Sequence, residues 1–185
     1  DYNMDPALMA DYTRRYGPFD WRHPQSHAFY WARRGSEIGA KRYENDDDIF
    51  RILNDDGTAI QAMQALAHSG LMSVDPFSED NPGRMHDARW IHAIDDYFRE
   101  LYTKHFDTRG AGADRFVDFH QNFMAQAIRE LYRSGDVEGA QKIMDELDKL
   151  YGRGGLIPNN KYAVPLEDFV RSSTYGEYEM VPDVA

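Results

Sequence analysis

Two histidines, His23 and His27, stand four residues apart, the spacing at which two imidazoles on one helix can hold a metal ion. A third ligand would have to come through the fold from the more distant histidines, which are His86, His92, His105 and His120. Pro24 argues against this site, because proline is typical of the first turn of a helix and places His23 at or before the cap. The simpler interpretation is that His23 caps a helix and that His27 packs on Trp31 one turn later.

Other catalytic patterns are weak. His92 precedes Asp95 and Asp96 at spacings that permit a local carboxylate contact, which can make a histidine a base but more often forms a pair on a helix surface. The chain has no cysteine, no Gly-x-Ser-x-Gly motif and no dinucleotide fingerprint. "RGAGAD" at 109–114 lacks the lysine of a phosphate loop. "ENDDD" at 44–48 lacks the ligand spacing of a calcium loop and suits a helix N-terminus.

Composition and charge narrow the function classes. The chain has 185 residues, of which 42% are hydrophobic and 14% aromatic, so it can bury a core. Its formal net charge of -11 makes general binding of nucleic acid unfavourable, because an acidic surface repels phosphate backbones. No segment approaches the roughly 20 apolar residues that a membrane span needs. The sequence begins at Asp1 rather than Met, and we expect it to be a fragment or a processed product.

Apolar side chains recur at helical spacing along most of the chain, and strand patterns are weak. We therefore predict an all-α protein of six or seven helices that form antiparallel hairpins. The expected helices cover residues 5–16 with Asp5 as cap, 24–43 with a break at Gly35, 49–53, 58–69 with Thr58 as cap, 84–106, 115–134 and 136–151. "NDDGT" at 54–58 is expected to be a turn.

The last part of the chain differs from the rest. Residues 153–185 are interrupted by Gly, Pro and Asn, yet they keep many apolar side chains. "PLEDFVRSS" at 165–173 could form one or two helical turns, and the remainder is expected to be extended. We predict a helical domain at 1–152 and an extended tail at 153–185 that packs on the helices.

Residues 130–152, "ELYRSGDVEGAQKIMDELDKLYG", form two amphipathic runs around a tight turn. The matching positions are Leu131 and Tyr132 in the first run, Gly135 and Asp136 in the turn, Ala140 at a close-approach position, and Ile143, Met144 and Leu147 on the inner face. This segment resembles a tetratricopeptide repeat, although Gly152 stands near where that repeat usually has a proline. "AFYWARRGSEIGAKRY" at 28–43 aligns with residues 128–143 without a gap, so Gly35 matches Gly135 and predicts a second, degenerate hairpin. Trp31 and Ala32 then match Leu131 and Tyr132, and both are expected to face the neighbouring helix.

The resemblance implies a groove that binds a protein or peptide. The first helix of each hairpin would line it with aromatic and arginine side chains, which are Tyr30, Arg33, Arg34, Arg129 and Arg133. These arginines would suit an acidic peptide or a carboxyl terminus, and the acidic tail of the chain itself is one candidate. A stretch of the form GPxDWR followed by HAxYWA also resembles uncharacterised bacterial proteins, which adds no mechanism.

The leading expectation is therefore a protein-interaction or scaffold domain without catalytic activity, cofactor or metal. The alternative is a small metal-dependent hydrolase on a helical scaffold that uses clustered histidines, with His23 and His27 as ligands. A third possibility is a structural segment of a larger chain.

Overall fold

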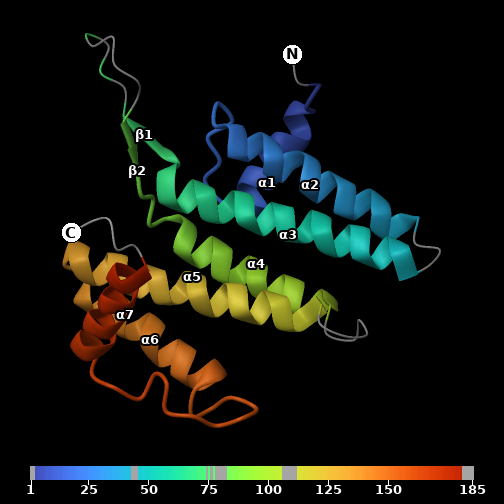
Figure 1. Ribbon diagram of the computed structural model, residues 1–185. Coiled ribbons are helices and arrows are strands. Elements are labelled where there is room, and N and C mark those ends of the chain that lie inside the picture. Colours follow the sequence, from blue (N-terminus) through green and yellow to red (C-terminus); the bar gives the residue numbers. More distant parts are fainter. Residues whose placement is uncertain are drawn as a thin grey trace. The chain divides into compact units, whose positions relative to one another are not determined.

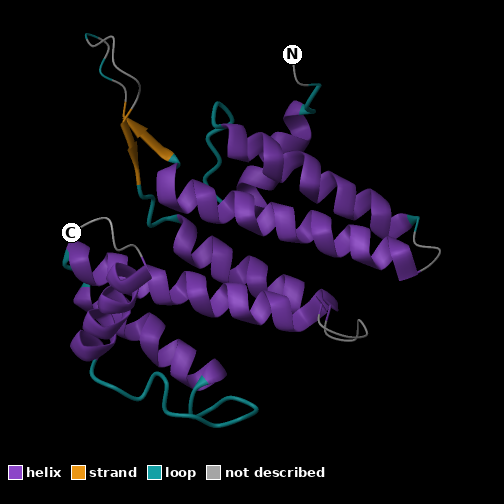
Figure 2. Cartoon of the chain, in the orientation of Figure 1, coloured by secondary structure: helices purple, strands orange, loops and turns teal. Residues whose placement is uncertain are grey.

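The computed structural model describes residues 3–42, 46–73, 75, 77, 83–105 and 112–180. In these ranges the regular secondary structure is helical apart from one short antiparallel hairpin (Figures 1 and 2). The helices are α1 (Pro6–Tyr16), α2 (Pro24–Lys41), α3 (Asp46–Ser69), α4 (Trp90–His105), α5 (Gly112–Ser134), α6 (Val137–Tyr151) and α7 (Leu166–Met180), and the strands are β1 (Leu71–Ser73) and β2 (Gly83–Met85). The predicted all-α class is confirmed. The two strands pair with Leu71 opposite Met85.

The chain divides into two compact units, Asp1–Asp118 and Phe119–Ala185. The first unit contains α1 to α4, the strand hairpin and the start of α5, and the second contains the rest of α5, α6 and α7. The expected domains, 1–152 and 153–185, stay a prediction.

Local capping sets where the first two helices begin. The Asp5 carboxylate accepts a hydrogen bond from the Ala7 amide at 2.8 Å, and Pro6 occupies the first turn of α1. His23 does the same for α2, since its Nδ1 accepts from the Gln25 amide at 3.1 Å. Both starts, and the predicted capping role of His23, are confirmed.

Helices α2 and α3 form an antiparallel hairpin (Figure 1). They approach closely at two glycines: a Cβ on Gly39 would lie 3.2 Å from Ile52 Cγ1, and one on Gly35 would lie 2.7 Å from Asp55 Oδ2. The predicted break at Gly35 is wrong, and so is the degenerate hairpin at 28–43, because residues 28–41 belong to a single helix. Gly35 lets α2 and α3 approach closely because it has no side chain, and it does not form a turn.

The expected turn at "NDDGT" is also wrong, because α3 runs through it. Thr58 does not cap a helix; its hydroxyl donates to the Asn54 carbonyl oxygen one turn earlier, at 2.9 Å. Asp56 lies within this stretch of α3, and its side chain is buried in the first unit. A turn on the surface would expose this side chain. The acids at 44–48 lie largely outside the described residues.

Aromatic side chains form much of the core of the first unit. Phe29 lies at the centre, fully buried, with its ring 4.6 Å from that of Phe19 and 5.9 Å from that of Tyr97. Trp31 is not part of this core: 45% of it is exposed, whereas Ala32 beside it is buried. The expectation that Trp31 faces a neighbouring helix is therefore wrong. Its ring meets Tyr30 edge-on at 5.0 Å and presents the rest of its surface to solvent.

In the second unit, α5 and α6 form the predicted antiparallel hairpin. Gly135 has a φ of +92°, which favours glycine, and the Asp136 carboxylate caps α6 by accepting from the Gly139 amide at 2.9 Å. His120 Nδ1 lies 2.7 Å from the Tyr151 hydroxyl, which shows that the end of α6 returns along α5. Ala140 is fully buried.

Residues 153–180 belong to the second unit, and their conformation is only partly extended. Residues 153–165 form turns and irregular chain, whereas residues 166–180 form α7, a helix much longer than the one or two turns expected. α7 contacts α6. Between residues 153 and 174, the buried side chains are Tyr162, Leu166, Phe169 and Val170.

Candidate functional site

A buried carboxylate on α3 organises the polar centre of the first unit. The side chain of Asp56 is 0% exposed, and its Oδ2 lies 2.7 Å from Lys104 Nζ and 2.7 Å from His105 Nε2 at the end of α4. Burial alone would raise the pKa of Asp56, but the hydrogen bond from His105 and the charge of Lys104 outweigh it. The pKa of Asp56 therefore lies below its ordinary value, and the carboxylate is held ionised.

Arg33 on α2 is the second buried charge. Its side chain is 9% exposed and forms ion pairs with Glu37 at 3.2 Å and Glu100 at 3.1 Å. The guanidinium also lies over the rings of Tyr16, at 5.2 Å from the centroid, and Tyr97, at 6.0 Å. Burial alone would lower the pKa of Arg33, but the surrounding tyrosine and carboxylate groups hold it above its ordinary value. Arg33 is thus a cation fixed in position.

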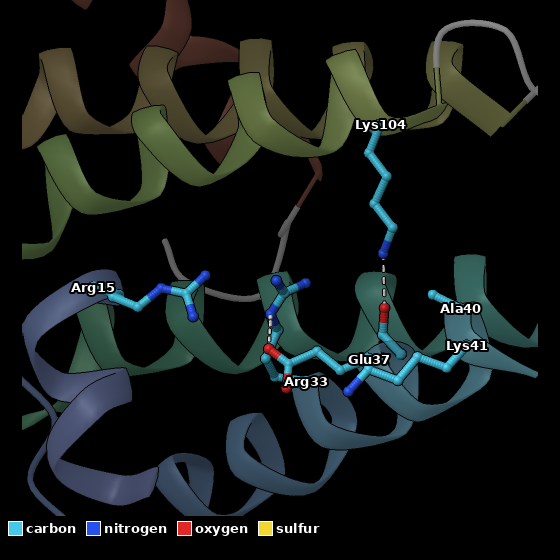
Figure 3. Close-up of a pocket in the computed structure, with 7 residues that line it drawn as sticks. Arg15, Arg33, Glu37, Ala40, Lys41 and Lys104 are labelled. Carbon is cyan, nitrogen blue, oxygen red and sulfur yellow. Dashed lines mark hydrogen bonds and ion pairs between the residues drawn. The ribbon is translucent and has the colours of Figure 1, made fainter.

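A groove of about 460 Å³ lies over these buried charges, between α1, α2 and α4. Its lining residues, most of them labelled in Figure 3, are Arg15, Arg33, Ser36, Glu37, Ala40, Lys41 and Lys104. Four of the seven carry a positive charge and one carries a negative charge. This is a local reversal of sign in a chain whose formal net charge is -11.

The four cations differ in how firmly they are held. Lys104 donates to Ser36 Oγ at 2.8 Å as well as to Asp56, so its ammonium is anchored in the floor of the groove. Arg15 is half exposed, pairs with Asp11 at 3.4 Å and donates to the Tyr16 hydroxyl at 2.8 Å. Lys41 is exposed and makes no hydrogen bond or ion pair within the part of the chain that the structure describes. Arg15 and Lys41 can therefore turn towards an incoming anion, while Arg33 and Lys104 stay fixed.

Glu37 limits what can enter the groove. It accepts a hydrogen bond from the Tyr12 hydroxyl at 3.0 Å and pairs with Arg33, so it is held between α1 and α2. Its negative charge lies among the four cations of the lining, so the potential along the groove is not uniformly positive. An anion gains most at the ends of the groove formed by Arg15, Lys41 and Lys104.

The five residues expected to line a binding groove have different environments. Arg33 lines the groove, whereas Tyr30 is buried and its hydroxyl accepts from the Asp5 amide at 2.9 Å. Arg34 is partly exposed on another side of α2. Arg129 and Arg133 belong to the second unit, where Arg133 donates to Thr174 Oγ1 at 3.1 Å.

The histidines considered for metal chemistry take part in the fold. His23 is 1% exposed and uses Nδ1 as a helix cap. His27 Nε2 lies 2.7 Å from the Trp21 carbonyl oxygen. His92 is exposed, and its neighbour Asp95 pairs with Arg99 one turn later at 3.0 Å. The closest pairing of a histidine with a carboxylate among the described residues of the first unit instead joins residues 49 positions apart, His105 and Asp56.

Sequence reasoning missed most of the groove. Arg15 and Lys104 stand in the last turns of their helices, where cations are favourable for the helix dipole, so their types alone point to no site. Asp56 falls within the stretch for which the sequence predicts a turn. One usable signal is present: Lys104 and His105 are adjacent polar side chains at the end of α4, which has a strongly apolar face.

Comparison of the chain with protein-family models, with curated proteins and with solved structures finds no match in any of the three. Among the described residues, no helix combines the length and the apolar character needed to cross a membrane.

Proposed function

We propose that this chain is a protein-interaction or scaffold domain without catalytic activity, and that its first unit binds an acidic segment of a partner protein. The observation that carries the proposal is the groove lined by Arg15, Arg33, Lys41 and Lys104 in an otherwise acidic chain. The resemblance of residues 130–152 to a tetratricopeptide repeat supports the same class of function, because proteins of that family mostly bind peptides or other proteins.

Carboxylates fit this groove in both geometry and charge. The guanidinium of Arg15 is half exposed and can bind a carboxylate with two parallel hydrogen bonds. Lys41 adds a mobile charge, and Arg33 and Lys104 contribute fixed charges that require no rearrangement on binding. Hydrogen bonds to charged groups contribute about 1.5–3 kcal/mol each, from which the cost of association must be subtracted.

The expected affinity is modest and depends on salt. Three such contacts of about 3 kcal/mol, less an association cost of about 4 kcal/mol, leave about 5 kcal/mol, which corresponds to a dissociation constant of about 0.2 mM at low salt. Because Arg15 and Lys41 face solvent, screening should weaken binding as the ionic strength rises past about 0.1 M.

A direct test measures fluorescence polarisation of a labelled oligoglutamate peptide, with an oligoglutamine peptide of equal length as the neutral control. Lys41→Glu and Arg15→Glu should each weaken binding of the acidic peptide by about tenfold. Two matched charge reversals lie beside these positions but outside the groove lining: Arg42→Glu and Arg14→Glu. If all four variants lose binding equally, general charge and not the groove is responsible, and the proposal fails.

The alternative of a metal-dependent hydrolase stays a prediction with its own test. It requires stoichiometric zinc, iron or copper in the purified protein, lost on substitution of His23 or His27. A protein free of such metal and indifferent to these substitutions would end that alternative.

A further inference from the structure

α2 carries a second surface that the groove does not include. Trp31 is 45% exposed and Ile38 is 39% exposed, and the two stand seven residues apart. Seven residues are two helical turns, so these side chains lie on the same side of α2, about 10 Å apart along its axis. Together the two side chains give this side of α2 a small apolar surface that a partner could cover.

Each of these apolar residues has a cation three positions later: Arg34 follows Trp31, and Lys41 follows Ile38. Residues three apart are neighbours on a helix surface. Within the described ranges, neither Arg34 nor Lys41 makes a hydrogen bond or an ion pair. The side of α2 away from the core thus alternates apolar and positively charged groups.

Lys41 also lines the groove, so the two surfaces are continuous. Trp31 is supported from beneath, because its ring packs edge-on against the buried ring of Tyr30 at 5.0 Å. A supported aromatic side chain loses little conformational freedom on binding, which is typical of residues that dominate interface energetics.

We propose that α2 docks an acidic amphipathic helix of a partner protein. The helix would place apolar side chains two turns apart against Trp31 and Ile38, and its carboxylates against Arg34, Lys41 and the groove. This inference rests on the proposed function, since it assigns the occupant of the groove. It adds that recognition needs apolar side chains as well as negative charge, and that the partner segment is helical.

The test compares two synthetic peptides of equal length and charge. In the first, glutamates surround leucines placed on one helical face, and in the second each leucine is replaced by serine. Wild-type protein should bind the leucine peptide roughly tenfold more tightly than the serine peptide. Trp31→Ser and Ile38→Ser should each remove most of this preference without changing affinity for the serine peptide. Lys41→Glu should weaken both peptides.

Leu156→Ser is the matched control, because Leu156 is 95% exposed and lies in the second unit. It should leave both affinities unchanged. Far-ultraviolet circular dichroism checks that each variant is folded. If Trp31→Ser does not fold, Ile38→Ser alone tests the apolar contact. A rise in peptide helicity on binding supports the helical occupant.

The outcomes separate this inference from the proposed function. Equal binding of both peptides, still sensitive to Lys41→Glu, would keep the acidic groove and overturn the apolar contact. A leucine preference that survives both serine substitutions would overturn it as well. If neither peptide binds, both proposals are overturned.

Discussion

Replacing the buried carboxylate Asp56 by asparagine should destabilise the first unit by about 3 kcal/mol. The carboxylate is fully buried and accepts two hydrogen bonds of 2.7 Å, one from Lys104 and one from His105. Bonds to charged groups contribute about 1.5–3 kcal/mol each, so their sum is about 3–6 kcal/mol. The lower end applies because asparagine keeps one acceptor oxygen and because Lys104, which is 28% exposed, can turn towards water.

Tryptophan fluorescence during urea unfolding measures this change in the first unit alone. All three tryptophans, Trp21, Trp31 and Trp90, lie between residues 1 and 118. The matched control is Asp55→Asn at the preceding position. Burial and the charge of Asp56 raise the pKa of Asp55, so its charged form is disfavoured and its loss should leave stability unchanged or slightly increased.

The pH dependence gives a second readout with a defined sign. The pKa of Asp56 is lower in the folded protein than the value of about 3.9 expected when the chain is unfolded. Its contribution is therefore complete above the unfolded pKa and is lost as the pH falls through the folded pKa. The difference in unfolding free energy between wild type and Asp56→Asn should be full at pH 7 and should shrink below about pH 4. A difference under about 0.5 kcal/mol at pH 7, or an equal loss in Asp55→Asn, would refute the reasoning.

Three further predictions concern packing. Ala140→Leu should lower the free energy of unfolding by about 1–3 kcal/mol because it overpacks a fully buried position, whereas Gln141→Leu at the exposed neighbouring position should not. Thermal unfolding followed by circular dichroism compares the two variants. Equal midpoints would show that position 140 tolerates a larger side chain. Removal of residues 153–185 takes away the buried side chains of Tyr162, Leu166, Phe169 and Val170 and should unfold the second unit, seen as lost helicity with unchanged tryptophan emission. Retained helicity of α6 would mean that the tail is dispensable. Trp31→Ala should cost less than about 1 kcal/mol and Phe29→Ala about 3–5 kcal/mol in urea unfolding. Similar costs for the two substitutions would show that Trp31 is part of the core.

Signals that act within a few residues can be predicted from the sequence. The caps at Asp5 and His23 and the turn at Gly135 and Asp136 are predicted correctly, because a cap or a turn and the amides that it serves are neighbours in the chain. The prolines after the first two caps strengthen the same assignment. These features place helix ends whatever the rest of the fold does.

Glycine shows where local evidence fails. Gly35 and Gly135 occupy matching positions in two similar stretches, yet the first lies inside a helix and the second forms a turn at φ +92°. The two glycines differ in the residues that surround them. Asp136 caps a new helix after Gly135, whereas Ser36 is buried and accepts from Lys104, and Asp55 of α3 occupies the space that a side chain at Gly35 would need.

The groove could not be predicted for a related reason. Its cations come from three helices, and Arg15 and Lys104 are separated by most of the first unit in sequence. Only the packing of α1, α2 and α4 brings them together. The apolar periodicity that predicts these helices describes which side faces the core, and it does not fix which polar groups meet at the edge of that core.

The buried carboxylate at position 56 makes the residue types at positions 56, 104 and 105 depend on one another. A chain that loses this acid but keeps Lys104 and His105 leaves both side chains without the carboxylate that they share. A chain that loses both partners leaves a buried carboxylate whose nearest described cation is Arg33, at 3.9 Å. Related sequences should therefore vary at positions 56, 104 and 105 jointly, by replacing the whole set with apolar residues or by exchanging it for another balanced set. Such covariation would identify distant members of the same fold even where the aromatic core has been replaced.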